Sequence, residues 1–178
     1  MITIHPAAID RLFVALYVKA HATTAREIIL DLDATDDPVH RAQRGRFFHG
    51  HYGQYCYLPL YTFAASTACF RLRLADDDAS AAATEEVARI VSQLRAVWRA
   101  VWRAVWIIVR AGSGFCRDPL LRWCETHAVD FVIGPAKNTR LTERVADDLA
   151  ATWMQCVDTD APSRAFAELT NQTFDSRS

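Results

Sequence analysis

The stretch "IILDLDATDDP", residues 28–38, places an apolar run directly before four aspartates. Alternation along a β-strand would put Leu30 and Leu32 on one face and Asp31 and Asp33 on the other. Close carboxylates repel each other unless a cation neutralises them, and Mg²⁺ prefers such oxygen ligands. The stretch therefore predicts a strand that buries its leucines and ends at a candidate metal site. The alternative is that these aspartates only cap turns.

The composition is that of an ordinary soluble domain. The chain has 178 residues, of which 51% are hydrophobic and 23% charged, with a net charge of -1, so no overall basic field points to nucleic acid. No apolar run reaches the roughly 18 residues of a membrane helix, and the N-terminus has no basic region typical of a signal peptide. The five cysteines form no CxxC pair. We expect one cytoplasmic domain over residues 1–178, not bound to a membrane.

The order of the predicted elements indicates the fold class. Strands that follow one another directly pair antiparallel, whereas strands separated by helices pair parallel. The pattern predicts an α/β protein with a mixed five-stranded sheet flanked by helices, the layout of an RNase H-like domain, although other mixed α/β folds also fit. The strands are predicted at 26–34, 55–66, 68–75, 105–111 and 129–134, and the helices at 1–22, 81–102, 119–127 and 138–156.

Further predictions concern a proline in one strand, the apolar face of the leading helix and the C-terminal residues. Pro59 indicates an edge position or a bulge in the strand at 55–66, because proline cannot donate to a sheet ladder. In the leading helix over residues 1–22, an apolar face is expected to pack on a core. Its residues are Ile9, Leu12, Phe13, Leu16 and Tyr17. Residues 159–178 show no long periodic pattern and are expected to form a loosely ordered tail.

Two clusters of arginine are candidates for contact with DNA. Arg41, Arg44 and Arg46 lie in a polar connection beside several aromatic residues, and they are the best local candidates for binding phosphate; the alternative is a solvated loop. The second cluster comes from "RAVWRAVWRAVW", residues 95–106, one four-residue unit written three times. It would form a basic row, or it is a small in-frame duplication tolerated at a helix end.

A family resemblance adds to this interpretation. The segment "IILDLDATDDPVHRAQRGRFFHGHYGQYCYLPLYTF", residues 28–63, resembles the DDE-type transposases of bacterial insertion sequences, in particular the subfamily whose first motif reads LDLDATDDP. The likeness continues through "IIVRAGSGFCRDPLLRWCETHAVDFVIGPAKNTRL" at 107–141 and "FAELTNQTFDS" at 166–176. It covers nearly all of the chain from about residue 10 onward.

The resemblance implies a catalytic centre and also damage to it. The family uses two aspartates and a glutamate to hold two divalent ions, usually Mg²⁺, for cutting and joining DNA. The first aspartate matches Asp33, with Asp31 as a neighbouring candidate ligand. The second belongs to a motif that reads RADSGF, but this chain has "RAGSGF", with Gly112 at that position. We expect Asp33 and Gly112 on adjacent strands. The glutamate would lie beyond the segment matching "TFDS", and the sequence ends at Ser178.

The resemblance therefore implies a truncated and degenerate transposase domain, incomplete at its C-terminus and inactive in cleaving DNA. Its expected partner is the DNA of transposon ends, and an intact transposase is a second candidate partner. A second hypothesis is a non-catalytic remnant that binds DNA or interferes with an intact enzyme. A third is the product of a pseudogene without a function. DNA binding without cleavage favours the second over the third.

Overall fold

The computed structural model describes residues 5–20, 26–50, 52–64, 68–75, 82–97 and 105–168. The chain divides into two compact units, residues 1–136 and residues 137–178.

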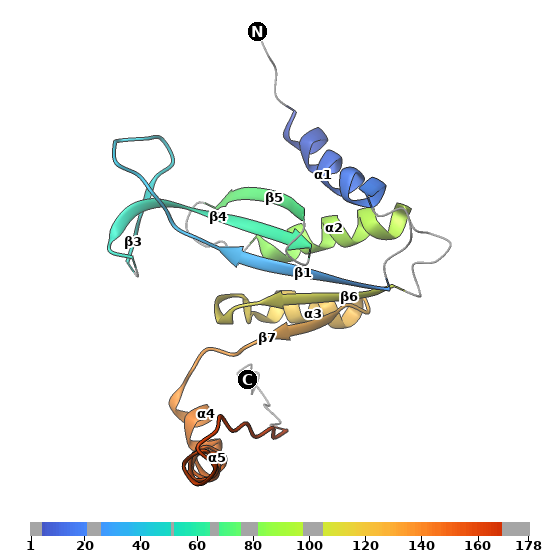
Figure 1. Cartoon of the computed structure of the whole chain (residues 1–178). Coiled ribbons are helices and arrows are strands. Elements are labelled where there is room, and N and C mark those ends of the chain that lie inside the picture. Colours follow the sequence, from blue (N-terminus) through green and yellow to red (C-terminus); the bar gives the residue numbers. More distant parts are fainter. Residues whose placement is uncertain are drawn as a thin grey trace, which may run out of the picture. The chain divides into compact units, whose positions relative to one another are not determined.

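The first unit is built on a mixed sheet (Figure 1). β1 pairs antiparallel with β4 and parallel with β6, β4 also pairs antiparallel with β5, and β6 pairs parallel with β7. The main strand order is therefore β5-β4-β1-β6-β7. The predicted mixed sheet is confirmed, but within the described residues it has seven strands and not five, because two further short strands also pair with β4. The strands are β1 (Glu27–Ala34), β4 (Gln54–Ala64), β5 (Ala68–Ala75), β6 (Trp106–Ala111) and β7 (Asp130–Ile133).

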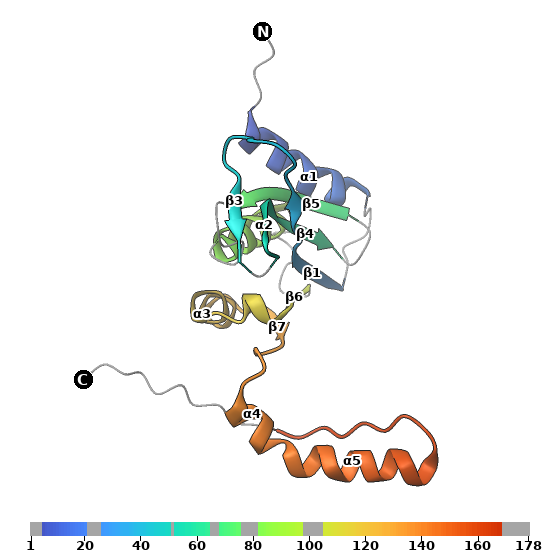
Figure 2. The same cartoon turned by 90° about the vertical axis from the view of Figure 1, so that its left-hand side faces the viewer.

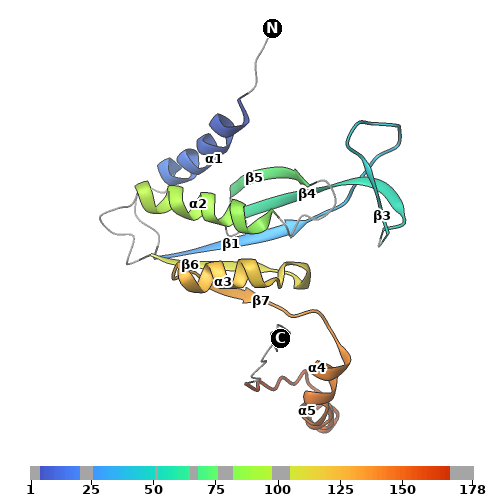
Figure 3. The ribbon, with the colours of Figure 1, turned by 180° about the vertical axis from the view of Figure 1, so that it is seen from behind.

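One face of this sheet carries the core. In β1 the buried residues are Ile28, Leu30 and Leu32, which alternate with more exposed positions as predicted. The helices α2 (Ala83–Val97) and α3 (Asp118–Thr126) lie on one side of the sheet, as Figures 2 and 3 show. Their buried residues are apolar with one exception, Glu86, which pairs with Arg89 one turn away. The odd-numbered positions of β1, Asp31 and Asp33 included, consequently belong to the opposite face.

The leading helix α1 (Pro6–Ala20) forms where helical spacing predicts it, and it contacts β5 and α2. Its buried positions differ from the prediction. Val14 and Tyr17 are buried, whereas the other four residues of the predicted face are 40–53% exposed. The helix is apolar nearly all round, so hydrophobic periodicity alone could not select the buried side.

Pro59 lies in an interior strand, so the prediction of an edge position is wrong, and the irregularity of β4 falls elsewhere, between Thr62 and Phe63. On the β1 side of β4, pairing with β1 stops at Leu60 and pairing with β2 begins at Tyr57. Pro59 occupies the gap between these two ladders, where no backbone donor is needed on that side.

A small three-stranded arm extends from the end of β1 (Figure 1). It consists of β2 (Asp37–Pro38), β3 (Phe47–His49) and the first part of β4, with both short strands paired antiparallel to β4. Neither short strand was predicted, because strands of two and three residues are too short for a visible alternation. Cys56, at the centre of the arm, is fully buried. Burial, followed by the nearby charges of Asp36 and Asp37, raises the pKa of its thiol.

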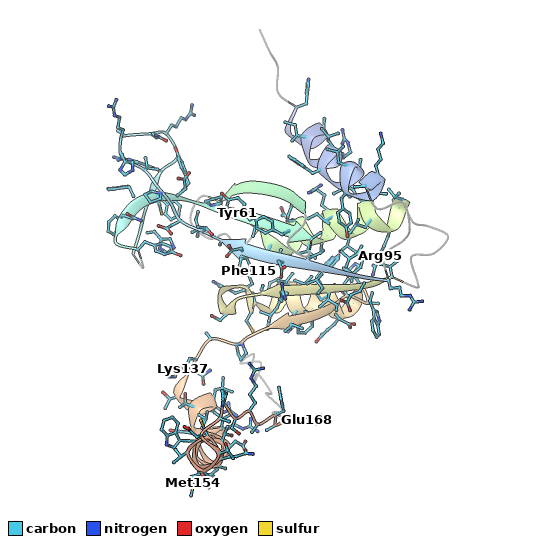
Figure 4. All side chains as sticks on the ribbon, in the orientation of Figure 1. Tyr61, Arg95, Phe115, Lys137, Met154 and Glu168 are labelled. Atoms are coloured by element: carbon cyan, nitrogen blue, oxygen red, sulfur yellow. The ribbon has the colours of Figure 1, made fainter. Side chains whose placement is uncertain are left out.

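The second unit holds two helices where one was predicted at 138–156. α4 (Thr139–Arg144) begins at Asn138, whose side chain accepts a hydrogen bond from the Leu141 amide at 2.8 Å. α5 (Ala146–Thr159) follows after a break at Val145. Neither helix contains a buried residue. Met154 of α5, labelled in Figure 4, is 66% exposed. Across the described residues, no helix is long and apolar enough to cross a membrane.

Candidate active site

Asp33 stands near the end of β1, on the face of the sheet opposite α2 and α3. Its side chain is exposed, and Oδ2 accepts a hydrogen bond from the Thr35 hydroxyl at 3.1 Å. Across the ladder Asp33 pairs with Tyr61 of β4, which is labelled in Figure 4. The Tyr61 ring stacks on that of Phe63, with centroids 5.9 Å apart. The carboxylate of Asp33 is thus held on a regular strand and open to solvent, as a metal ligand or a surface residue would be.

Asp31 lies on the same face, two residues earlier, and is bound by an arginine. The parallel ladder sets Asp31 beside Arg110 of β6. The guanidinium donates from Nε to Asp31 Oδ1 at 2.5 Å and from Nη2 to Oδ2 at 2.8 Å. The hydrogen bond to Asp31, and then its charge, raise the pKa of Arg110. Because both carboxylate oxygens accept from Arg110, a cation could bind Asp31 only in competition with this side chain.

Gly112 directly follows β6, at the position where the family resemblance implies an aspartate. The last pair of the β1–β6 ladder joins Leu32 to Ala111, so Asp33 and Gly112 are the next residues on two adjacent strands. The predicted adjacency of these strands is confirmed. The backbone of Gly112 is extended (φ -73°, ψ 174°), a conformation open to any residue. A Cβ built on Gly112 would meet no atom within 4 Å. The fold thus has both the backbone and the space for an aspartate here.

Two other acidic residues, Asp36 and Asp118, are engaged in local structure. Asp36 accepts a hydrogen bond from the Gln54 side chain at 2.8 Å. Asp118 lies in the first turn of α3 and forms an exposed ion pair with Arg122 at 3.5 Å. Within the described parts of the chain, no three His, Cys, Asp or Glu residues lie close enough to hold a metal ion together. These donors do not fit a centre with two metal ions, which needs several carboxylates around a pair of ions.

The three arginines of the polar connection lie on the arm. Arg41 and Arg44 are exposed, and Arg46 is half-buried, with its guanidinium 4.3 Å from the centroid of the Tyr55 ring. Arg46 Nη1 also donates to the Arg41 carbonyl at 3.2 Å, and the Tyr57 hydroxyl donates to the Arg44 carbonyl at 2.8 Å. The connection is therefore fastened to β4, with two arginine side chains directed to solvent.

The repeated segment at 95–106 gives a different result. Arg95 donates from Nη2 to the carbonyls of His127 and Ala128, at 2.7 and 3.1 Å, which joins the end of α2 to the end of α3. Partial burial lowers the pKa of this guanidinium. Arg95 therefore has a structural role at the junction of these two helices. Residues 98–104, including the other two arginines of the repeat, lie outside the described residues.

Comparison with known protein families identifies the chain. Residues 3–176 match the family described as transposase DDE domain group 1. The chain belongs to this family of transposases. The match runs over nearly the whole sequence and includes Asp33, the RAGSGF motif and the arm. No curated protein matches the chain.

Solved structures with a similar arrangement are distant in sequence. The catalytic domain of Mos1 mariner transposase is 7% identical with a TM-score of 0.43, covering 92% of this chain and 85% of that one. The HTLV-2 integrase catalytic core domain, in complex with magnesium, is 10% identical with a TM-score of 0.39, covering 74% and 73%. A chain of the simian T-cell lymphotropic virus intasome is 12% identical with a TM-score of 0.37, and the match covers 74% of this chain and 42% of that one.

The predicted class, an RNase H-like α/β domain of the DDE transposase family, is confirmed. Sequence reasoning missed the ion pair of Asp31 with Arg110. The only signal was an arginine at the end of an apolar strand, and the register of two parallel strands cannot be read from such a signal. Of the candidate site residues, the transposase fold gathers Asp31, Asp33 and Gly112 at one end of the sheet and puts the three arginines on the neighbouring arm.

Proposed function

We propose that this transposase domain binds the DNA of transposon ends and does not cleave it. The observation that carries this proposal is the open, side-chain-free position at Gly112, beside Asp33 on the adjacent strand. The family resemblance implies that this position supplies the second carboxylate of the metal centre. Removing one preorganised catalytic group typically lowers a rate by about 10²–10³, and cutting a phosphodiester through two ions needs both of them in a fixed relation.

Asp31 is a poor substitute for the missing carboxylate. Its two oxygens accept hydrogen bonds from Arg110, and the positive charge of this guanidinium would repel a metal ion bound to Asp31. Asp33 alone can hold one divalent ion with the help of water, since Mg²⁺ is often bound through one or two carboxylates. The domain is therefore proposed to keep a weak site for Mg²⁺ at Asp33 and to lack the paired site that supports catalysis.

DNA binding is proposed for the arm. Arg41 and Arg44 are exposed on a connection that is fastened to β4 by the Arg46 and Tyr57 side chains. Beyond Asp37 of β2, residues 39–57 of the arm contain three arginines and no aspartate or glutamate, although the whole chain carries a net charge of -1. The basic arm therefore stands out locally as an attractive surface for phosphates.

The direct test of binding is fluorescence anisotropy with labelled duplex DNA taken from the sequences that flank this gene. The unmodified chain should bind, with an affinity that falls as salt rises. The double variant Arg41→Gln/Arg44→Gln should bind more weakly, and the slope of log affinity against log salt should drop by about 0.9 for each phosphate that the variant no longer neutralises. The matched control is Arg122→Gln/Arg140→Gln, which removes the same charge outside the arm. Equally weakened binding in both variants, or no binding by the unmodified chain, would contradict the proposal.

A further inference from the structure

Three side chains gather on one face of the arm. Phe48 of β3 and Tyr55 of β4 are direct cross-strand partners, and their rings meet edge to face with centroids 5.5 Å apart. The Arg46 guanidinium covers one side of the Tyr55 ring at 4.3 Å. Phe48 is 57% exposed and Tyr55 is 47% exposed. We name Arg46, Phe48 and Tyr55 the stacking cluster.

The packing of the arm does not explain why the rings of Phe48 and Tyr55 are exposed. The opposite face of the arm supplies its packing, because Cys56 is fully buried and Phe47 packs against the core of the first unit. Exposed aromatic rings backed by a stacked arginine are flat apolar surfaces with a positive charge beside them. Such a surface suits a partner that is flat and apolar in one part and anionic in another.

Unpaired nucleotides have this chemistry. Every base has a π-face that can stack on an aromatic side chain, and the phosphate between bases carries the negative charge that arginines attract. In a duplex the base faces are stacked on one another, so a protein reaches chiefly phosphates and groove edges. Phosphate contacts alone would use the arginines of the arm and leave Phe48 and Tyr55 without a function.

We propose that the stacking cluster binds unpaired bases of DNA, next to the duplex that Arg41 and Arg44 contact. This inference rests on the proposed DNA-binding function and assigns a second type of DNA to the arm. β4 continues without interruption from Tyr55 to Tyr61, the partner of Asp33. At a rise of about 3.4 Å per residue, the cluster lies about 20 Å from the candidate active site. A DNA strand bound on the arm could therefore extend to the aspartate end of the sheet.

The test uses two DNA probes: a single strand of thymidines with one central 2-aminopurine, and a blunt duplex of equal length. Stacking on the cluster should quench the 2-aminopurine fluorescence of the single strand. Phe48→Leu keeps an apolar side chain but removes the ring, and Arg46→Lys keeps the charge but removes the planar group. Each should weaken single-strand binding about tenfold and reduce the quenching, because stacking on an aromatic side chain makes a substantial contribution for each base. Phe48→Leu should change duplex binding less than about twofold, since the phosphate contacts of Arg41 and Arg44 remain.

The matched control is Phe166→Leu, which removes a 93% exposed ring from the second unit, and it should change neither probe. Thermal unfolding of each variant shows whether the arm remains folded. Unchanged single-strand affinity and quenching in Phe48→Leu and Arg46→Lys would overturn the inference, as would binding of both probes that is equally weakened in Phe48→Leu. Duplex binding that still depends on Arg41 and Arg44 would then leave the proposed function standing. If the unmodified chain binds neither the single strand nor the duplex, both proposals are overturned.

Discussion

Asp31 and Arg110, 79 residues apart in the sequence, form a two-point ion pair across the parallel strands β1 and β6. The pair lies on the same face as Asp33, immediately beside the candidate metal site. Of the two aspartates on this face of β1, Asp31 therefore joins two strands, whereas the side chain of Asp33 is exposed to solvent.

Restoring the carboxylate at position 112 should increase the affinity for a divalent ion. Gly112→Asp would place a second carboxylate beside Asp33 in an extended backbone with no atom to displace. We expect calorimetry to show tighter Mn²⁺ binding in this variant, with no loss of thermal stability when Mn²⁺ is present. The gain should vanish in Gly112→Asp/Asp33→Ala.

A suitable control for that experiment is Gly114→Asp, two residues further along, where a Cβ also meets no atom within 4 Å. It adds the same charge beyond the end of the ladder. If both glycine variants raise the affinity equally, net charge explains the effect, and the assignment of Gly112 to the metal site is wrong.

Removing the arginine of the ion pair should make Asp31 available to a cation. Arg110→Gln should strengthen Mn²⁺ binding, because both oxygens of Asp31 lose their donors and the repelling charge disappears. The free energy of unfolding should change little, since the Arg110 side chain is 58% exposed and exposed ion pairs contribute little to stability. Arg122→Gln, which removes an ion pair at the start of α3, serves as the control. Unchanged Mn²⁺ affinity in Arg110→Gln would show that Asp31 does not reach the site.

The sheet core should be sensitive to the leucine that precedes the aspartates. Leu30 is fully buried, so Leu30→Ala should lower the free energy of unfolding by about 2–5 kcal/mol through reduced burial and a residual cavity. Leu149→Ala, at a 58% exposed position of α5, should change it by less than about 0.5 kcal/mol. Chemical denaturation followed by circular dichroism measures both. A similar small effect at the two positions would mean that β1 is not the centre of the core.

The main strands of the sheet and the helices that flank it could be predicted, because their hydrophobic patterns extend over enough residues to be recognised. The alternation of Leu30 and Leu32 with Asp31 and Asp33, and the strand–helix order that follows, were sufficient for the mixed sheet. The family motif, not the residue pattern, pointed to position 112.

Other features depend on register or on residues distant in the sequence. The pairing of Asp31 with Arg110 requires the alignment of two parallel strands, and the burial of Val14 in α1 requires the position of a neighbouring helix. The stacking cluster depends on β3, a strand of three residues inside a polar and glycine-rich connection. Local patterns carry little information about such features.

A plasmid-nicking assay with the unmodified chain decides whether the domain binds DNA without cutting it. A supercoiled plasmid that carries the DNA flanking this gene is incubated with the protein in Mg²⁺ or Mn²⁺, with the Asp33→Ala variant in parallel. We expect binding without metal-dependent nicks or joined products, because Gly112 supplies no second carboxylate and Asp31 is bound by Arg110. Metal-dependent nicking by the unmodified chain that disappears in Asp33→Ala would show instead that a working metal centre forms around Asp33.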